Sequence, residues 1–412
     1  MSPHRWKILG LGFAANASFS AVISGLPATS VLMRSAYGVD TAAVGTALSA
    51  TGLGIALSEL PWGLLTDRLG DRRVLLAGLT LTTLLLLAMT IWTAPGAPHA
   101  WTLLVAALGA IGLVGGSVNG ASGRAVMAWF DASERGLAMS IRQTALPAGG
   151  VLGALLLPWV ASVWGFAAAY GALALLCAAC VASTWIWLHE PSSLPATVAS
   201  AVPTSRTLLR DLKVWRLAAG MSLLCVPQIA VLGFTSVFLH DVAGLGMGQT
   251  TAAMVLYQSG SAVLRVWAGR WTDRHANRRI FLGVCSLVTA GIFLMLAPLG
   301  LAAEHRPGSP VFASLLFAII AIGGVIASCW HGVAFTELAV HAGPTRVGSA
   351  LGLGNTFVFA SYFLTPLWVP QIVTHWGWPM AWTAIAGCAL LARPLLRLRS
   401  ASRPVPSSAH RA

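Results

Sequence analysis

Apolar runs whose length matches a lipid bilayer are the strongest constraint on how this chain of 412 residues folds. About 20 apolar residues in a helix are needed to cross a hydrocarbon core of about 30 Å. Twelve such runs are present, bounded by charged residues and by clusters of glycine and proline, so we predict an all-α integral membrane protein with twelve transmembrane helices. They cover residues 8–32, 42–65, 74–94, 100–124, 137–160, 163–188, 215–239, 249–271, 279–300, 310–335, 347–369 and 376–396.

The composition agrees with this prediction and argues against a soluble globular domain. Hydrophobic residues make up 57% of the chain and charged residues only 9%, and the mean hydropathy is +0.77. All six cysteines fall inside the predicted spans without the paired spacing of a zinc site. We therefore expect no structural disulfide, no bound metal and no cofactor.

The net charge of +13 is distributed along the chain in step with the predicted spans. Of the 25 Lys and Arg residues, only Arg34 and Arg306 fall in odd-numbered loops, and only Arg142 and Arg265 fall well inside spans. The remaining 21 lie in the N-terminal segment, the C-terminal tail and the even-numbered loops, or at the span ends beside them. The positive-inside rule therefore predicts a multi-pass protein of the plasma (inner) membrane with both termini in the cytoplasm.

This distribution bears on the partners of the chain. A nucleic-acid binder gathers its basic residues on one face of a folded domain, so we expect no nucleic acid here. A basic cytoplasmic surface instead favours contact with anionic membrane lipid.

A polar stretch at residues 189–213, rich in Ser, Pro and Ala, divides the predicted spans six and six. It is typical of a cytoplasmic linker. We expect an N-terminal six-helix bundle over residues 1–188 and a C-terminal six-helix bundle with a basic cytoplasmic tail over residues 214–412.

An internal repeat relates the two halves at a constant offset of 206 residues. The loop after the second predicted span reads GLLTDRLGDRR at 63–73, and the loop after the eighth reads GRWTDRHANRR at 269–279. A weaker repeat, which needs a gap of one residue, pairs residues 135–144 with 346–356 and aligns Gln143 with Asn355.

The first loop resembles the signature of the major facilitator superfamily, Gly-x-x-x-Asp-Arg-x-Gly followed by basic residues. The second loop departs from it because His275, Ala276 and Asn277 supply no glycine, and Asp71 stands in the first loop where the family usually has a basic residue. Together with the six-plus-six layout, the resemblance covers nearly the whole chain. It implies two pseudo-symmetric six-helix bundles around a central cavity that opens alternately to the two sides of the membrane.

The resemblance also implies a cytoplasmic gate made of charged residues in these loops. It implies salt bridges between Asp67 and Arg124, and of Glu134 and Glu337 with Arg72 and Arg278. Such bonds form when the cavity opens outward and break when it opens inward. We assign to this gate Gly63, Asp67, Arg68, Gly70, Arg72, Arg124, Glu134, Gly269, Asp273, Arg274, Arg278 and Glu337.

Two ionisable residues are predicted deep in the bilayer, where a charge costs several kcal/mol. Of the twelve acidic residues, only Glu59 lies inside a span, eight positions before Asp67 and so about 12 Å from the inner surface. Arg265 precedes Asp273 by the same eight positions, which predicts that it faces Glu59 across the cavity. Either Arg265 binds an anionic substrate group and Glu59 takes up a proton, or the two form a structural ion pair.

Other polar residues inside spans are candidates for the same site. Arg142 lies about 10 Å inside the fifth span and either binds substrate or extends to the headgroups. Gln143, Asn355 and Gln228 are expected to line the cavity as neutral hydrogen-bonding groups. Cavity lining and helix packing are both open for Asn16, Asn119 and His331, and His331 would also suit a proton relay.

We therefore predict a monomeric secondary transporter that moves a small organic anion or zwitterion, coupled to protons. A proton-driven exporter of drugs or metabolites is the alternative. Pro147, Gly149 and Gly150 resemble part of the family's exporter motif, but Leu146 stands where that motif has glycine, so the match does not fix the direction of transport. An intramembrane enzyme is disfavoured because the sequence has no His-Glu-x-x-His or Gly-x-Ser-x-Gly motif.

Overall fold

The computed structural model describes residues 4–39, 41–189, 210–306 and 308–397, and it contains helices and no strand within them. The first half holds α1 (His4–Gly25), a 3₁₀ turn (Leu26–Thr29), α2 (Ser30–Tyr37), α3 (Thr41–Leu69), α4 (Asp71–Trp92), α5 (Ala100–Trp129), α6 (Arg135–Gln143) and α7 (Ala145–Trp187). The second half holds α10 (Leu212–Asp241), α11 (Met247–His275), α12 (Arg278–Glu304), α13 (Pro310–Ser328), α14 (His331–Ala342) and α15 (Val347–Leu396).

Two of these helices each contain two predicted spans. Gly165, with φ of 80°, interrupts α7, and Gly377, with φ of 77°, interrupts α15. Glycine adopts such positive φ angles without the strain that a Cβ atom would bring. The two residues are 212 apart, which is also the distance between Gln143 and Asn355, so the halves repeat their backbone breaks as well as their loops.

The predicted membrane spans are accounted for by these helices. Eight segments of the described residues are long and apolar enough to cross a membrane, and two of them are the interrupted helices. The other two spans correspond to α3 and α11, each 29 residues long, which are the helices that carry Glu59 and Arg265. The all-α membrane fold is confirmed.

Three predicted spans are broken where the sequence suggested one helix. The run at 8–32 changes to a 3₁₀ turn that contains Pro27, and the run at 310–335 breaks between Ser328 and His331. The run at 137–160 breaks at Thr144, three residues before Pro147. Proline has no N–H to donate, so Pro147 leaves the carbonyl of Gln143 without its partner in the helix.

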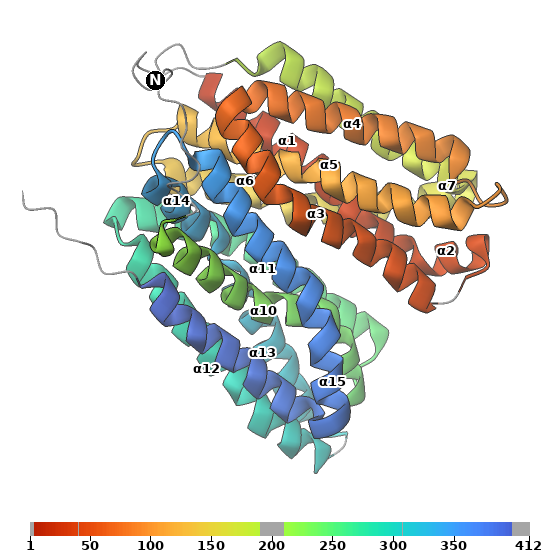
Figure 1. Cartoon of the computed structure of the whole chain (residues 1–412). Helices are drawn as coiled ribbons and strands as arrows, with labels where there is room; N and C mark the ends of the chain where they lie inside the picture. The colour runs from red at the N-terminus through yellow and green to blue at the C-terminus, as the bar shows by residue number, and fades with distance from the viewer. Residues whose placement is uncertain (1–3, 40, 190–209, 307, 398–412) are drawn as a thin grey trace, which may run out of the picture.

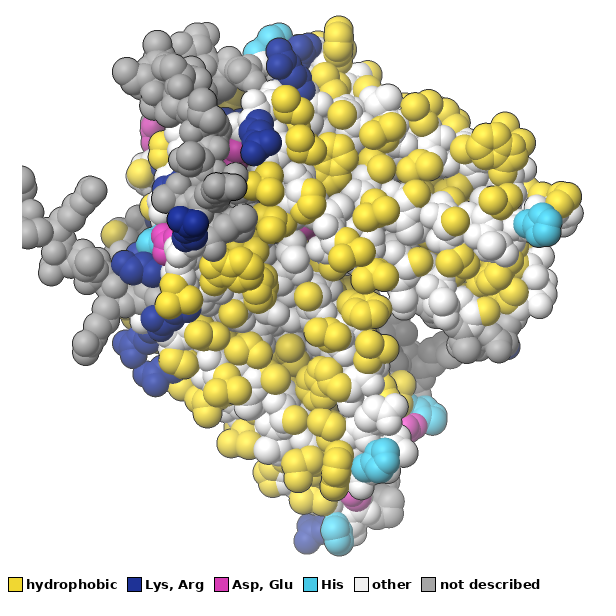
Figure 2. All heavy atoms as spheres, in the orientation of Figure 1, with side chains coloured by type: hydrophobic (Ala, Val, Ile, Leu, Met, Phe, Trp, Pro, Cys, Tyr) yellow, Lys and Arg dark blue, Asp and Glu magenta, His cyan; other side chains and the backbone are white. Residues whose placement is uncertain are grey.

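Figure 1 shows that the helices of the first half lie together, as do those of the second half. The two groups meet near α6 and α14 and diverge toward the other end of the molecule. In Figure 2 the Lys and Arg side chains gather mainly at the joined end, which we call the basic end, and the surface is indented between the groups at the opposite end.

The buried cores follow the same division. One cluster of buried apolar side chains contains only residues between Ile8 and Leu188, and another contains only residues between Val226 and Ala386. A third joins Leu9 and residues of 126–139 to the second half. We propose on this basis the bundles 1–188 and 214–412, joined by the linker 189–213, of which residues 190–209 lie outside the described part.

Candidate transport site and gate

A buried polar cluster in the first half surrounds Glu59, which has no exposed surface. Asn119 Nδ2, from α5, donates a hydrogen bond to Glu59 Oε1. Arg142, at the end of α6, donates from Nη2 to the Asn119 carbonyl (2.6 Å) and from Nε to Ser122 Oγ (3.0 Å). Asn16 on α1 completes the cluster, because one orientation of its amide accepts from Arg142 Nε and donates to Asn119 Oδ1 (2.8 Å).

The cluster leaves Glu59 only partly satisfied. Oε2 of Glu59 has no hydrogen-bond partner among the described residues. Asn355, from the second half, lies beside the Glu59 carboxyl group. The positive charge of Arg142 also acts on this carboxyl group, but the two side chains form no direct salt bridge in the described structure. A buried carboxylate with a free oxygen is costly unless that oxygen binds a proton or another donor.

Arg265, which is only 3% exposed, is the centre of a second polar cluster. Its Nε donates to the carbonyl of Ser328 (2.8 Å) and its Nη1 to the carbonyl of Gln143 (3.0 Å). Ser328 and Gln143 are the last residues of α13 and α6. The final carbonyls of a helix lack intrahelical donors and carry the negative end of the helix dipole, so both attract the guanidinium.

No carboxylate forms an ion pair with Arg265 among the described residues. Its electrostatic neighbours are the groups of Tyr257, Cys225, Cys329 and His331. The guanidinium is therefore held in place by neutral acceptors.

Glu59 and Arg265 are not direct partners in the described structure, because neither is among the hydrogen-bond or ion-pair partners of the other. Equal depth in the repeat puts them at equivalent places in two different clusters, because α3 packs against α5 and α15 whereas α11 packs against α6 and α13. Each residue instead meets the aligned residue of the other half: Arg265 bonds the Gln143 carbonyl, and Asn355 lies beside Glu59.

The remaining candidates fall into these two clusters. Arg142 is 2% exposed and bonded to α5, so it does not extend to the headgroups. His331 stacks on Trp330 at 3.9 Å and bonds the Ser328 carbonyl (3.2 Å). Gln228 lies beside the Tyr257 hydroxyl.

The loop aspartates bind helix N-termini of the opposite half. Asp67 accepts hydrogen bonds from the backbone N–H groups of Gly348 and Ser349 (both 2.7 Å) at the start of α15. Asp273 accepts from the backbone N–H of Leu137 (2.8 Å) at the start of α6. Orphan N–H groups and the positive end of the helix dipole favour a carboxylate at these places.

Asp67 lies in the last turn of α3, beyond the predicted span 42–65. Burial raises the pKa of the Asp67 carboxyl, and the hydrogen bonds from Ser349 and Gly348 and the charge of Arg124 oppose that rise.

Arg124 and Arg278 support the two aspartates. Arg124 Nε lies 3.7 Å from Asp67 Oδ1, and its Nη1 pairs with Asp71 Oδ1 at 2.5 Å. Arg278 pairs with Asp273 at 2.7 Å. The aspartate that departs from the family signature thus supplies a partner to the gate arginine.

Other expected gate pairs are wrong. Glu134 pairs with Arg5 (2.5 Å) and Glu337 pairs with Arg279 (2.5 Å), because these arginines lie nearer than the predicted ones. Arg72 donates to the Trp185 carbonyl (3.0 Å) and lies over its ring. Within the same loops Arg68 and Arg274 are exposed, and Gly70 has φ of 86° between α3 and α4.

Glycines allow the two halves to touch at the basic end. A Cβ atom on Gly63 would clash with the carbonyl oxygen of Gly348, and one on Gly269 would clash with the carbonyl oxygen of Gly136. The two contacts are equivalent in the repeat. Together with the aspartate caps they close the basic end.

The sequence alone did not identify Ser122, Tyr257, Ser328 or the caps at Ser349 and Leu137. Neutral groups in a span carry little signal because many of them only bond a neighbouring helix. Gly136 and Gly348, however, lie within the weaker repeat, so the sequence contained a sign of the closed contact.

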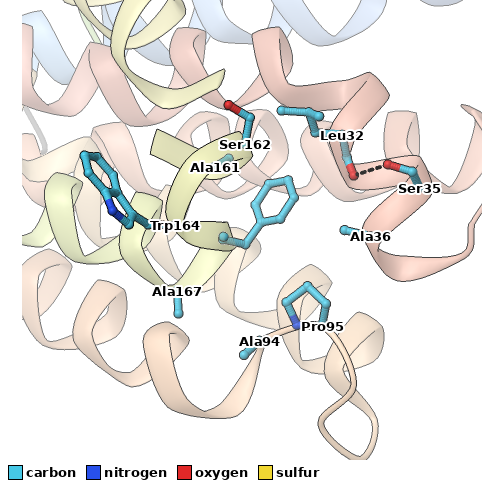
Figure 3. Close-up of a pocket in the computed structure, with 11 residues that line it drawn as sticks. Leu32, Ser35, Ala36, Ala94, Pro95, Ala161, Ser162, Trp164 and Ala167 are labelled. Atoms are coloured by element: carbon cyan, nitrogen blue, oxygen red, sulfur yellow. Dashed lines mark hydrogen bonds between the residues drawn. The ribbon is translucent and has the colours of Figure 1, made fainter. Parts of the chain in front are cut away.

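A surface pocket of about 480 Å³, drawn in Figure 3, lies apart from both clusters between α2, α7 and the segment after α4. Its lining has no charged residue, and its two hydroxyl groups are already used by their own helices. Ser35 donates to the Leu32 carbonyl (3.0 Å) and Ser162 to the Trp159 carbonyl (2.9 Å). The pocket therefore has little to bind a charged solute.

The chain is similar to members of one protein family. The model of the Major Facilitator Superfamily matches residues 9–366 and 253–412. An uncharacterized MFS-type transporter of Mycobacterium tuberculosis is 30% identical over 396 residues, which are 96% of this chain and 85% of that protein. The probable galactarate/D-glucarate transporter GudP of Bacillus subtilis is 26% identical over 194 residues, 46% of this chain and 42% of that protein. The solved structure of the proton:xylose symporter XylE has the same fold, with a TM-score of 0.75, 13% identity and 95% of both chains covered.

Proposed function

This chain belongs to the major facilitator superfamily of secondary transporters, and we propose that it moves a small organic anion together with protons. The family resemblance stated from the loop signature is thus confirmed, and the chain is a membrane transporter rather than an enzyme. We further propose that it works as a monomer in the plasma membrane, surrounded by lipid, with the basic end in the cytoplasm.

The observation that carries the substrate class is the state of Arg265. Its guanidinium is buried, fixed by two helix-end carbonyls and unpaired with any carboxylate of the described residues. A buried cation without an anionic partner is costly in a membrane, and an anionic substrate relieves that cost. The name of the GudP relative, which refers to two sugar dicarboxylates, supports an anion, although the match covers less than half of either chain.

Glu59 is the candidate for proton coupling. Its carboxyl group is fully buried with one unbonded oxygen, so protonation removes a charge that has no direct counter-ion. Because Arg142 lies in the same cluster and Asn355 belongs to the other half, a proton on Glu59 changes contacts that join the halves. Protonation of Glu59 therefore shifts the equilibrium between the outward-open and inward-open states.

The first test is ligand-dependent thermal stability of the purified protein. We expect a small carboxylate at about 100 times its Kd to stabilise the wild type by about 2.7 kcal/mol, and Arg265→Gln to abolish the effect. Arg270→Gln, an exposed arginine on the same helix, is the matched control and should keep the response. Stabilisation by lipophilic cations that persists in Arg265→Gln would overturn the anion site and favour the exporter alternative.

A further inference from the structure

The outer face of the first half has a groove that belongs neither to the buried clusters nor to the gate. It lies between α4 and the second part of α7, which pack side by side (Figure 1). Its volume is about 360 Å³, and none of its lining side chains is charged. Leu84, Trp185 and Ile186 line it and are each more than half exposed. Both helices are apolar enough to cross a membrane, so the groove faces the lipid.

Arg72 lies against one wall of this groove. Its guanidinium lies over the ring of Trp185, 4.8 Å from the ring centre, and its Nη2 donates to the Trp185 carbonyl (3.0 Å). Arg72 is the second residue of α4, and Trp185 is two residues from the end of α7, so both lie near the ends of their helices. Tryptophan is common at the level of the lipid headgroups, and its ring attracts a cation. The groove thus has a positive charge, held in place, at its headgroup end.

The charge of Arg72 has no counter-ion among the described residues. Its equivalent in the repeat, Arg278, pairs with Asp273 at 2.7 Å, whereas no described carboxylate pairs with Arg72. The Nε atom of Arg72 is buried and donates to no described group. A buried donor without an acceptor costs free energy, and hydrogen bonds from a guanidinium to an anionic oxygen are strong. An anion at this place supplies both the acceptor and the missing negative charge.

We propose that this groove binds one anionic phospholipid, with its phosphate on Arg72 and one acyl chain along the walls formed by α4 and α7. A free anion would use the charge of Arg72 and leave the apolar groove empty. An uncharged hydrocarbon would fill the groove and leave Arg72 without an acceptor. A phospholipid of net negative charge meets both requirements in one molecule. None of these groups belongs to the clusters of Glu59 and Arg265, so the lipid binds whether or not a solute is transported.

Native mass spectrometry of the purified full-length protein tests the role of the charge. The protein is mixed with phosphatidylglycerol or with phosphatidylcholine that has the same acyl chains, and the bound lipid is counted. We expect one retained phosphatidylglycerol per chain and a preference of about fivefold over phosphatidylcholine, as one basic side chain near the membrane surface gives. Arg72→Gln should reduce this preference toward one. Arg73→Gln removes the same charge from the next residue, which is exposed, and should keep the preference.

A second pair of variants tests the groove itself. Ala182 lines the groove, so Ala182→Phe fills it and should lower the retention of phosphatidylglycerol at least fivefold. Ala179 is exposed on the same helix outside the lining, so Ala179→Phe should retain the lipid. Arg265→Gln should retain it too, which separates this site from the transport site.

Three results would overturn the lipid site. Equal losses in Arg72→Gln and Arg73→Gln would show a diffuse attraction of the basic end for anionic lipid. Undiminished retention in Ala182→Phe would place the lipid elsewhere. A wild type that retains no phosphatidylglycerol, or that appears as a dimer whose formation Ala182→Phe prevents, would leave the groove to another occupant. Each variant is compared at equal helix content by circular dichroism, so that a loss of lipid is not a loss of fold.

Discussion

Glu59 and Arg265 occupy equivalent positions in the two halves, yet different kinds of groups compensate their charges. Glu59 is bonded by an amide and lies near a guanidinium, whereas Arg265 is bonded by carbonyls at the ends of two helices. Pro147 explains part of this difference, because it removes the donor that would otherwise occupy the Gln143 carbonyl. One proline thus creates an acceptor for the buried arginine of the opposite half.

At this scale the sequence predicted which charges are buried but not their partners. Burial follows from the cost of a charge in a bilayer, which depends only on depth along the span. The partner depends on the direction in which each side chain leaves its helix and on which helices are neighbours. Neither can be read from the number of residues that separates Glu59 from Asp67 or Arg265 from Asp273.

Replacing Glu59 by glutamine should separate proton coupling from substrate movement. Glutamine resembles the protonated carboxyl group but does not exchange a proton, so Glu59→Gln should lose accumulation driven by a pH gradient and retain exchange of substrate across the membrane. Both activities are measured in proteoliposomes with labelled substrate. Glu304→Gln, an exposed acid at the end of α12, is the control. Gradient-driven accumulation that persists in Glu59→Gln would remove Glu59 from the coupling mechanism.

Among the helices, the gate consists of two equivalent contacts in which α3 meets α15 and α11 meets α6. In each contact an aspartate caps the opposite helix and a glycine permits close approach. The loop signature predicted which residues take part, since it marks the aspartates and glycines. It did not show that the aspartates bind backbone N–H groups, because every residue except proline carries such a group and the sequence does not mark the ones that are used.

Alanine at the gate glycines should open the basic end. Gly63→Ala and Gly269→Ala place a methyl group against a carbonyl oxygen of the other half, and such overpacking costs about 1–3 kcal/mol. Since 1.4 kcal/mol is a factor of about ten, the ratio of molecules closed at this end to molecules open there should fall about tenfold. The measurement is the distance between spin labels at the exposed positions Leu69 and His275, by double electron–electron resonance.

Each of these variants has a control on its own helix. A Cβ atom on Gly52 of α3 or on Gly248 of α11 meets nothing within 4 Å. Gly52→Ala and Gly248→Ala should therefore leave the distance distribution unchanged and stabilise the helix by up to about 1 kcal/mol. An unchanged distribution in Gly63→Ala and Gly269→Ala would mean that these contacts do not hold the basic end closed.

For the molecule as a whole, the structure is closed at the basic end and indented between its halves at the other. With the basic end in the cytoplasm, as we propose, this is the outward-facing state. The lengths of the apolar runs predicted the spans, and the 206-residue repeat predicted the relation between the halves. They did not predict which of the two states the chain adopts, because both states bury similar apolar surface and differ mainly in the contacts between bundles.

The central claim is that a proton gradient drives an organic anion through this protein, and uptake into proteoliposomes tests it most directly. Vesicles that contain the purified protein would be given a labelled carboxylate with and without an imposed pH gradient, and with a protonophore. We predict accumulation above the external concentration that depends on the gradient, disappears with the protonophore and is absent in Arg265→Gln. Uptake that only equilibrates regardless of the gradient, or transport of lipophilic cations and of no carboxylate, would contradict the claim.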